Sequence, residues 1–170
     1  MIRYTPEKIA ALRPNEIFVF GSNLAGHHGG GAASIAHERF GAVWGIGTGL
    51  QGNSYAIPTM QGGIDTIKPY VDEFICFARL HSELTFYVTR IGCGIAGFSD
   101  SEIAPLFDKA YDVKNIILPE SFYKIINHAR QLNSETNVLK FHAIPIKFFE
   151  EDRIKMESMS REEKTNYVQN

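Results

Sequence analysis

The segment EIFVFGSNLAGHHGGGAASIAHERF (residues 16–40) decides the predicted fold. Its first part, residues 16–22, is a short apolar run of β-favouring residues and predicts a strand. The run ends in a glycine-rich turn, and residues 29–40 can form a helix that opens directly after the glycines. A strand that turns into a helix in this way exposes backbone N–H groups beside the positive end of the helix dipole. The segment therefore predicts a binding site for phosphate.

The turn differs from the two best-known phosphate motifs. No Lys-Ser or Lys-Thr pair follows the glycines, as the P-loop of nucleoside triphosphatases requires, and the spacing is not the GxGxxG of dinucleotide-binding folds. The motif alone thus indicates a phosphate-containing ligand and no particular nucleotide class. The residues of this turn expected to touch the ligand are Ser22, Asn23, Gly26, Gly29, Gly30, Gly31 and Ala32.

Strand and helix patterns alternate along the rest of the first 133 residues. Further strands are predicted at 42–49, 54–59, 84–91 and 115–119, and further helices at 66–82, 99–111 and 120–132. Pro69 fits the first turn of its helix, and Ser99 with Glu102 forms a capping box. The alternation predicts an α/β fold with a mostly parallel sheet covered by helices on both faces.

A second glycine-rich segment, GCGIAGF (residues 92–98), follows the apolar run 84–91. Twelve of the 15 glycines lie in residues 21–63 and the other three in 92–97. Glycine is needed where the backbone takes a positive φ or approaches a ligand closely. Parallel sheets bind ligands at the carboxyl edge of their strands, so two such loops are predicted to grip a pyrophosphate from both sides. The alternative is that the glycines form tight turns and nothing more.

These segments resemble the macro-domain family. FVFGSNLAGHHGGGAASIAHERFGA is similar to the family's signature, in which a strand ends near an Asn and a glycine-rich loop opens a helix. VTRIGCGIAGFSDSEIAPLFDKA resembles its second loop, SYAIPT an interior strand, and NIILPESFY the last strand with its adenine-side turn. The resemblance covers roughly residues 16–130 and is closest to uncharacterised bacterial and phage macro-like proteins.

Macro domains are three-layer α/β/α modules that bind ADP-ribose, and some hydrolyse ADP-ribosyl linkages. The resemblance implies the same fold and ligand class here. It implies that Asn23 contacts the distal ribose, that Gly29, Gly30 and Gly31 line that ribose and the adjoining phosphate, and that Phe122 lies near the adenine. Contacts from the second loop are implied for Gly92, Cys93, Gly94, Ile95, Ala96, Gly97 and Phe98.

Three departures from the family pattern favour binding over hydrolysis. The early acidic residue that contacts adenine has no counterpart in LRPNEIFVFGSN, and the acid that hydrolytic members place after the glycines falls at Ala33. The paired glutamates of the poly(ADP-ribose)-degrading branch are reduced to Glu38 beside His37. If the protein is a hydrolase, its candidate bases are His27, His28 and Glu38.

Two other functions remain open. One is a non-catalytic reader of ADP-ribosylated protein or of a NAD-derived signal. The other is a different nucleotide or nucleoside hydrolase on a Rossmann-like sheet. A catalytic member of either hydrolase class needs an acid or base close to the labile ribose carbon or its water.

Composition and cysteine content exclude several classes. Hydrophobic residues make up 44% and charged residues 21% of 170, which indicates a globular protein, and the net charge of −2 argues against a nucleic-acid binder. No apolar run reaches the ~18 residues of a membrane helix, and MIRYTPEKIAALRPNE lacks a signal core, so a cytoplasmic protein is expected. Two cysteines, Cys76 and Cys93, are too few for a four-Cys zinc site or a disulfide scaffold. We expect no bound metal or cofactor. Cys76 is predicted to lie in the core. The oligomeric state stays open.

The chain changes character near Ser134. No glycine follows, charges of both signs are mixed, and VLKFHAIPIKFF (138–149) is apolar enough to dock on a surface. We therefore divide the chain into a macro-like domain, 1–133, and a C-terminal extension, 134–170, packed on that domain.

Overall fold

The structure, a computed structural model, describes residues 1–142. The elements in chain order are β1 (Glu16–Ser22), α1 (Gly31–Arg39), β2 (Gly49–Gln51), β3 (Ser54–Pro58), α2 (Ile64–Leu80), β4 (Thr85–Val88), α3 (Asp100–Ile103), the 3-10 helix η1 (Ala104–Ala110), β5 (Ile116–Ile117) and α4 (Glu120–His142). The chain divides into two units, Met1–Ala129 and Arg130–Asn170. Most of the expected 134–170 extension lies outside the described residues, so its packing stays a prediction.

The sheet is five-stranded and mixed, in the order β2-β3-β1-β4-β5. β1 lies at the centre and pairs in parallel with β3 on one side and β4 on the other, and β5 continues the parallel set. β2 alone among these strands runs antiparallel, against β3. The predicted α/β fold with a mostly parallel sheet is confirmed.

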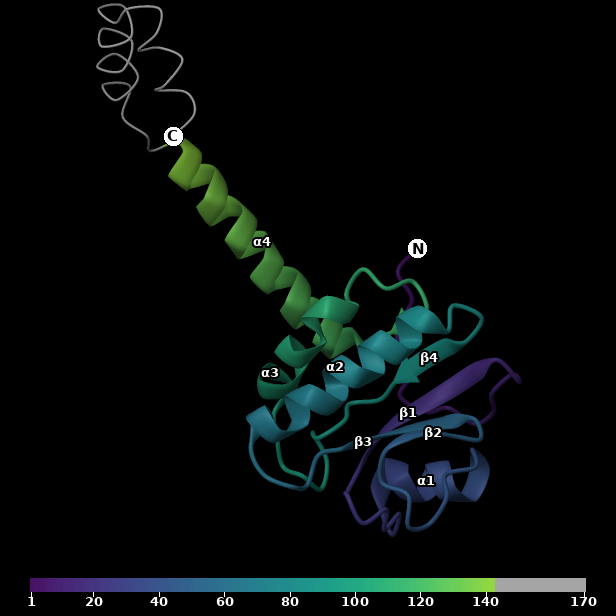
Figure 1. Cartoon of the computed structure of the whole chain (residues 1–170). Coiled ribbons are helices and arrows are strands. Elements are labelled where there is room, and N and C mark those ends of the chain that lie inside the picture. The colour runs from purple at the N-terminus through teal and green to yellow at the C-terminus, as the bar shows by residue number, and fades with distance from the viewer. Residues whose placement is uncertain (143–170) are drawn as a thin grey trace, which may run out of the picture. The chain divides into compact units, whose positions relative to one another are not determined.

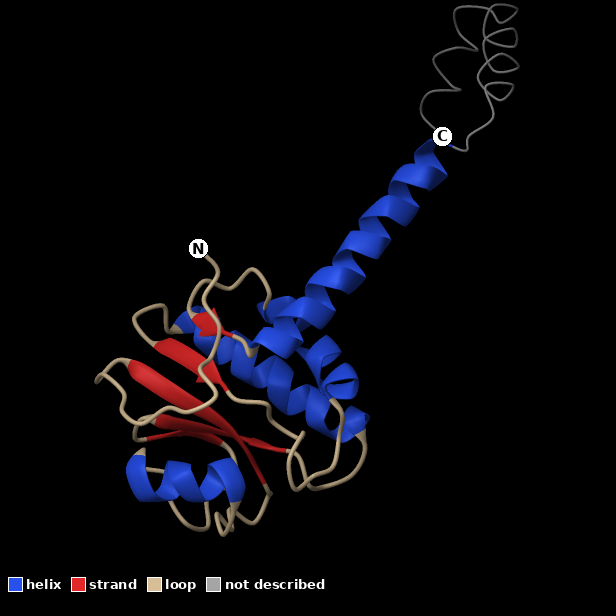
Figure 2. Cartoon of the chain, turned by 180° about the vertical axis from the view of Figure 1, so that it is seen from behind, coloured by secondary structure: helices blue, strands red, loops and turns tan. Residues whose placement is uncertain are grey.

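Helices cover both faces of the sheet, as Figures 1 and 2 show. Alternate side chains of β1 point to opposite faces, as the period of a strand requires. Ile17 and Val19 join the larger core under α2, η1 and the start of α4. Phe18 and Phe20 join a smaller core under α1. The central strand is buried on both faces because each face has its own helical layer.

Two local predictions are correct in detail. The capping box is present: the Ser99 side chain accepts from the backbone of Glu102, whose carboxylate accepts from the Ser99 N–H at 2.8 Å. The predicted helix over 66–82 is α2, whose buried side chains recur at helical spacing.

Four local predictions are wrong. Residues 42–48 form a loop rather than a strand, and only the short β2 follows it. α2 begins at Ile64, so Pro69 lies in its second turn. Cys76 is exposed on α2 rather than in the core. The last helix does not end at residue 132 but continues to His142, across the predicted domain boundary.

Within residues 1–142, no helix combines the length and the apolar character needed to cross a membrane.

Candidate functional site

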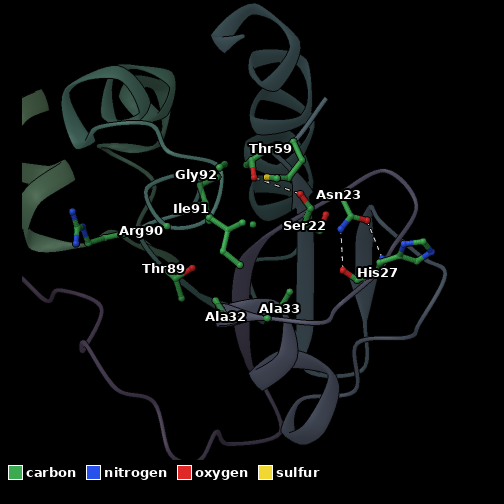
Figure 3. A pocket seen from close by; sticks show the side chains of 17 residues that line it. Ser22, Asn23, His27, Ala32, Ala33, Thr59, Thr89, Arg90, Ile91 and Gly92 are labelled. Carbon is green, nitrogen blue, oxygen red and sulfur yellow. Dashed lines mark hydrogen bonds between the residues drawn. The ribbon is translucent and has the colours of Figure 1, made fainter. Parts of the chain in front are cut away.

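The two glycine-rich loops meet in one pocket of about 220 Å³, at the carboxyl ends of β1, β3 and β4. Figure 3 shows Ala32 and Ala33 of α1 facing Thr89 and Ile91 across it. The ring of His27 and the guanidinium of Arg90 lie at opposite ends of the pocket in this view. Its lining residues are Gly21, Ser22, Asn23, His27, Gly30, Gly31, Ala32, Ala33, Thr59, Met60, Thr89, Arg90, Ile91, Gly92, Gly94, Ile95 and Ala96.

The first loop leaves β1 through a turn closed by Asn23. Its side-chain oxygen accepts from the His27 N–H at 2.9 Å, and its amide nitrogen donates to the His27 carbonyl at 2.9 Å (Figure 3). Asn23 therefore stabilises the loop, as Asn does in many turns, while it also borders the pocket. α1 then begins at Gly31 with Gly30 as its N-cap, and neither a capping side chain nor an acidic residue occupies this end.

The second loop leaves β4 and bends sharply at Gly92. Gly92 has φ +71°, and a Cβ there would lie 2.9 Å from Cδ1 of Ile103, so a larger residue would be both strained and crowded. The Gly92 carbonyl accepts from the Phe98 N–H at 2.9 Å, which closes the loop. Ile95 stands on the loop with 75% of its surface exposed and reaches the glycines of the first loop.

Ten of the residues predicted from sequence border this pocket, and they come from both loops. They are Ser22, Asn23, His27, Gly30, Gly31, Ala32, Gly92, Gly94, Ile95 and Ala96. The other eight do not border it: Gly26, His28, Gly29, Glu38, Cys93, Gly97, Phe98 and Phe122.

Three of these eight have clear structural roles instead. Gly26 has φ +67°, and a Cβ there would lie 2.3 Å from the Ile46 nitrogen, so it permits close packing of two loops. Phe122 is 0% exposed and packs 5.7 Å from Phe107, ring centre to ring centre, so it cannot stack on an adenine. Phe98 packs against the larger core.

Two of the three candidate bases are also displaced from the pocket. His28 is 1% exposed, and its Nε2 lies 3.0 Å from the Val43 carbonyl and 3.1 Å from the Ile46 carbonyl. That nitrogen must carry the proton, because both partners are acceptors. Glu38 is exposed on α1 outside the pocket. His27 remains as a candidate, at the pocket's edge.

Cys93 points to a carboxylate rather than to the pocket. Burial and, to a smaller extent, a hydrogen bond with Asp100 raise the pKa of its thiol to about 12. Burial would raise the pKa of Asp100 too, but the hydrogen bonds and positive charge of Arg90 counteract it, and the pKa is lowered. Arg90 donates from Nη2 to Asp100 at 2.7 Å and from Nε to both carboxylate oxygens at 3.1 Å. A thiol held in this way is a poor nucleophile.

Sequence reasoning missed a second, larger pocket of about 930 Å³ that shares Thr89 and Arg90 with the first. Its other lining residues are Tyr4, Thr5, Pro6, Glu7, Asp100, Pro119, Glu120, Ser121 and Lys124. The N-terminal segment reaches this edge of the sheet because Thr5 donates from its N–H to the Leu118 carbonyl at 2.9 Å and from its hydroxyl to the Ile117 carbonyl at 2.8 Å. No local pattern in residues 1–15 signals this pairing.

The structure brings no cluster of three His, Cys, Asp or Glu side chains together for a metal ion within the part of the chain it describes. No family model matches the sequence, and no curated protein or solved structure shows a significant match to it.

Proposed function

We propose that this protein has a macro-like domain that binds ADP-ribose or a related nucleotide-diphosphate metabolite. The observation that carries the proposal is the convergence of both glycine-rich loops on one pocket, where parallel strands end. Open α/β sheets bind their ligands at this edge.

The pocket offers groups that suit phosphate. The N-terminus of α1 borders the pocket without a capping side chain, and Gly30 and Gly31 let a ligand approach its first backbone N–H groups closely. Arg90 adds a cation at one end of the pocket, with 62% of its side chain exposed. A diphosphate would lie between this arginine and the helix terminus.

The adjoining second pocket suits the nucleoside end of the same ligand. It begins at Thr89 and Arg90, where the first pocket ends, so one extended molecule would occupy both. Glu7 brings a carboxylate that accepts from an exocyclic amine, and Tyr4 brings an aromatic ring. Glu7 would then contact adenine in place of the early acidic residue that has no counterpart in LRPNEIFVFGSN.

The chemistry of the first pocket favours binding over hydrolysis. No Asp or Glu is among its lining residues in the described chain, and Ala33, which the macro-domain resemblance matches to the acid of hydrolytic members, borders it. His27 is the one candidate base that borders it. We therefore favour a non-catalytic reader or metabolite-binding protein over an ADP-ribosyl, nucleotide or nucleoside hydrolase.

Titration calorimetry tests the proposal with ADP-ribose, ADP and AMP. We expect ADP-ribose to bind at least tenfold more tightly than AMP, because the pocket pair offers contacts to two phosphates and a second ribose that AMP lacks. Equal affinities for ADP-ribose and AMP would contradict the claim that the pocket recognises a diphosphate. Absence of heat with all three ligands, checked by a thermal-shift assay, would overturn it.

A further inference from the structure

The loop over residues 42–48 presents large apolar side chains to solvent. Val43, Trp44 and Ile46 are 47%, 54% and 45% exposed. The segment packs closely on the first glycine-rich loop, since Gly45 donates to the Gly26 carbonyl at 2.9 Å and a Cβ on Gly47 would lie 2.1 Å from the Asn23 carbonyl oxygen. Apolar side chains gathered at one exposed place mark binding surfaces.

Buried polar side chains hold this loop in place. His28 donates from Nε2 toward the Val43 and Ile46 carbonyls, at 3.0 and 3.1 Å. Gln51 bonds the same two residues: its Oε1 accepts from the Val43 N–H at 2.7 Å, and its Nε2 donates to the Ile46 carbonyl at 3.1 Å. Both ends of the exposed turn are therefore fixed by side chains that are themselves buried.

Two further side chains complete the support from other elements. The buried Ser22, at the end of β1, donates from its hydroxyl to the Gly47 carbonyl. His37 of α1 places Nδ1 2.7 Å from the Ala42 carbonyl. A loop fixed by four side chains loses little conformational freedom when it binds, which is the advantage of preorganisation.

The fixed loop stacks Trp44 on His27. Their ring centres are 5.5 Å apart with 20° between the planes, an offset-stacked arrangement. His37 and His28 contact Trp44 edge-on, with ring centres 5.9 and 6.3 Å away. His27 borders the first pocket at the end opposite Arg90 (Figure 3). Because Trp44 stacks on His27, the His27–Trp44 ring pair lies beside this end of the pocket.

We propose that the His27–Trp44 ring pair receives a planar heteroaromatic group attached to the ribose end of the bound ligand, as nicotinamide is attached in NAD⁺. The inference rests on the proposed function, because it needs the rest of the ligand in the two pockets. A planar ring gains affinity by stacking on such a surface, and a pyridinium ring adds a cation–π attraction to Trp. A nucleic-acid strand is disfavoured, since strand-binding grooves combine aromatic rings with a basic track and this chain carries a net charge of −2.

Trp44 is the sole tryptophan of the chain, so its fluorescence reports directly on the ring pair. We expect NAD⁺ to quench this emission at saturation, and ADP-ribose, which lacks the nicotinamide ring on its distal ribose, to quench it much less. Calorimetry should show NAD⁺ binding roughly fivefold to a hundredfold more tightly than ADP-ribose, the range that one stacked ring contributes.

Substitutions of Trp44 test whether its aromatic ring, rather than its apolar character alone, is needed for the preference for NAD⁺. In Trp44→Leu the ratio of NAD⁺ to ADP-ribose affinity should fall to near one, whereas Trp44→Phe should keep most of it. Leu80→Ala is the matched control, because Leu80 is also exposed but lies at the end of α2. Its ratio should equal that of the wild type.

The outcomes distinguish this inference from the proposed function. If ADP-ribose binds but NAD⁺ binds no more tightly and leaves Trp44 emission unchanged, the ring pair has no such role and the proposed function stands. If neither ligand binds, both are overturned. A preference for NAD⁺ that survives in Trp44→Leu would also contradict the inference.

Discussion

Gly30 and Ile95 bring the two glycine-rich loops into contact: a Cβ built on Gly30 lies 3.2 Å from Cδ1 of Ile95. The two residues belong to different loops, 65 positions apart, and border the same pocket. Gly30 has φ −158°, an extended conformation open to any residue, so the backbone does not require glycine there. The absence of a side chain at Gly30 serves to keep space in the pocket.

Substitution in this space should block the ligand without unfolding the protein. We expect Gly30→Val and Gly94→Val each to weaken ADP-ribose binding at least tenfold, because their side chains enter the pocket. Thermal stability should stay within a few degrees, since a Cβ on Gly94 meets no atom within 4 Å and one on Gly30 meets only a flexible side-chain tip. Calorimetry and a melting curve measure the two effects.

Gly26→Ala is the contrasting variant for that prediction. Its Cβ would clash with the Ile46 backbone at 2.3 Å and sit at φ +67°, so it should lower the melting temperature clearly. Normal ligand binding by both Gly30→Val and Gly94→Val would mean that the site lies elsewhere.

Release of ADP-ribose from modified aspartate or glutamate should be very slow or absent. General acid–base catalysis typically contributes ~10²–10⁴-fold in rate, and no carboxylate lines the first pocket within the described residues. The assay compares the wild type with His27→Ala and Glu38→Gln on one ADP-ribosylated protein. Fast turnover that is lost in His27→Ala would identify a base and refute the reader proposal.

His28→Ala should lower the stability of the fold rather than change catalysis. The substitution leaves the Val43 and Ile46 carbonyls without the Nε2 donor and opens a space beside Phe20. We expect a loss of about 2–4 kcal/mol in the free energy of unfolding. Denaturant melts of the wild type and the variant measure this loss, and unchanged stability would contradict the structural role of His28.

Cys93 should resist alkylation in the folded protein. Its pKa of about 12 leaves almost no thiolate near neutral pH, and the thiolate is the reactive form. In a Cys76→Ser background, the alkylation rate should rise about tenfold per pH unit through the range in which the protein stays folded. A plateau near pH 8 would show an ordinary thiol and contradict the contact with Asp100.

Asp100→Asn should destabilise the protein by about 1 kcal/mol at pH 7, since it removes the bidentate partner of a mostly exposed Arg90. The folded-state pKa of Asp100 lies below its ordinary value of 3.8. The carboxylate therefore contributes its stability above pH 3.8 and loses it as the pH falls through the folded pKa. Denaturant melts from pH 7 to pH 3 should show that the difference in unfolding free energy between the wild type and Asp100→Asn becomes smaller as the pH falls. A difference in unfolding free energy that grows as the pH falls would contradict the lowered pKa of Asp100.

Much of the fold and part of the candidate site follow from local sequence pattern. The apolar run at Glu16–Ser22 predicts the central strand, and the Ser99–Glu102 capping box predicts where α3 begins. These predictions succeed because strand period, helix period and caps depend on residues a few positions apart. The meeting of the two glycine-rich loops also follows, since parallel strands end at the same edge.

Only the tertiary structure decided what the residues between those signals do. The 42–48 segment has a strand-like composition, yet side chains from β1, α1 and β2 satisfy its backbone polar groups and hold it as a loop. His28 has the sequence context of a base, yet it is buried beneath that loop. The N-terminal residues Tyr4 and Glu7 border the second pocket because Thr5 pairs with residues more than a hundred positions away. Each outcome depends on partners distant in the chain, and local periodicity carries no information about them.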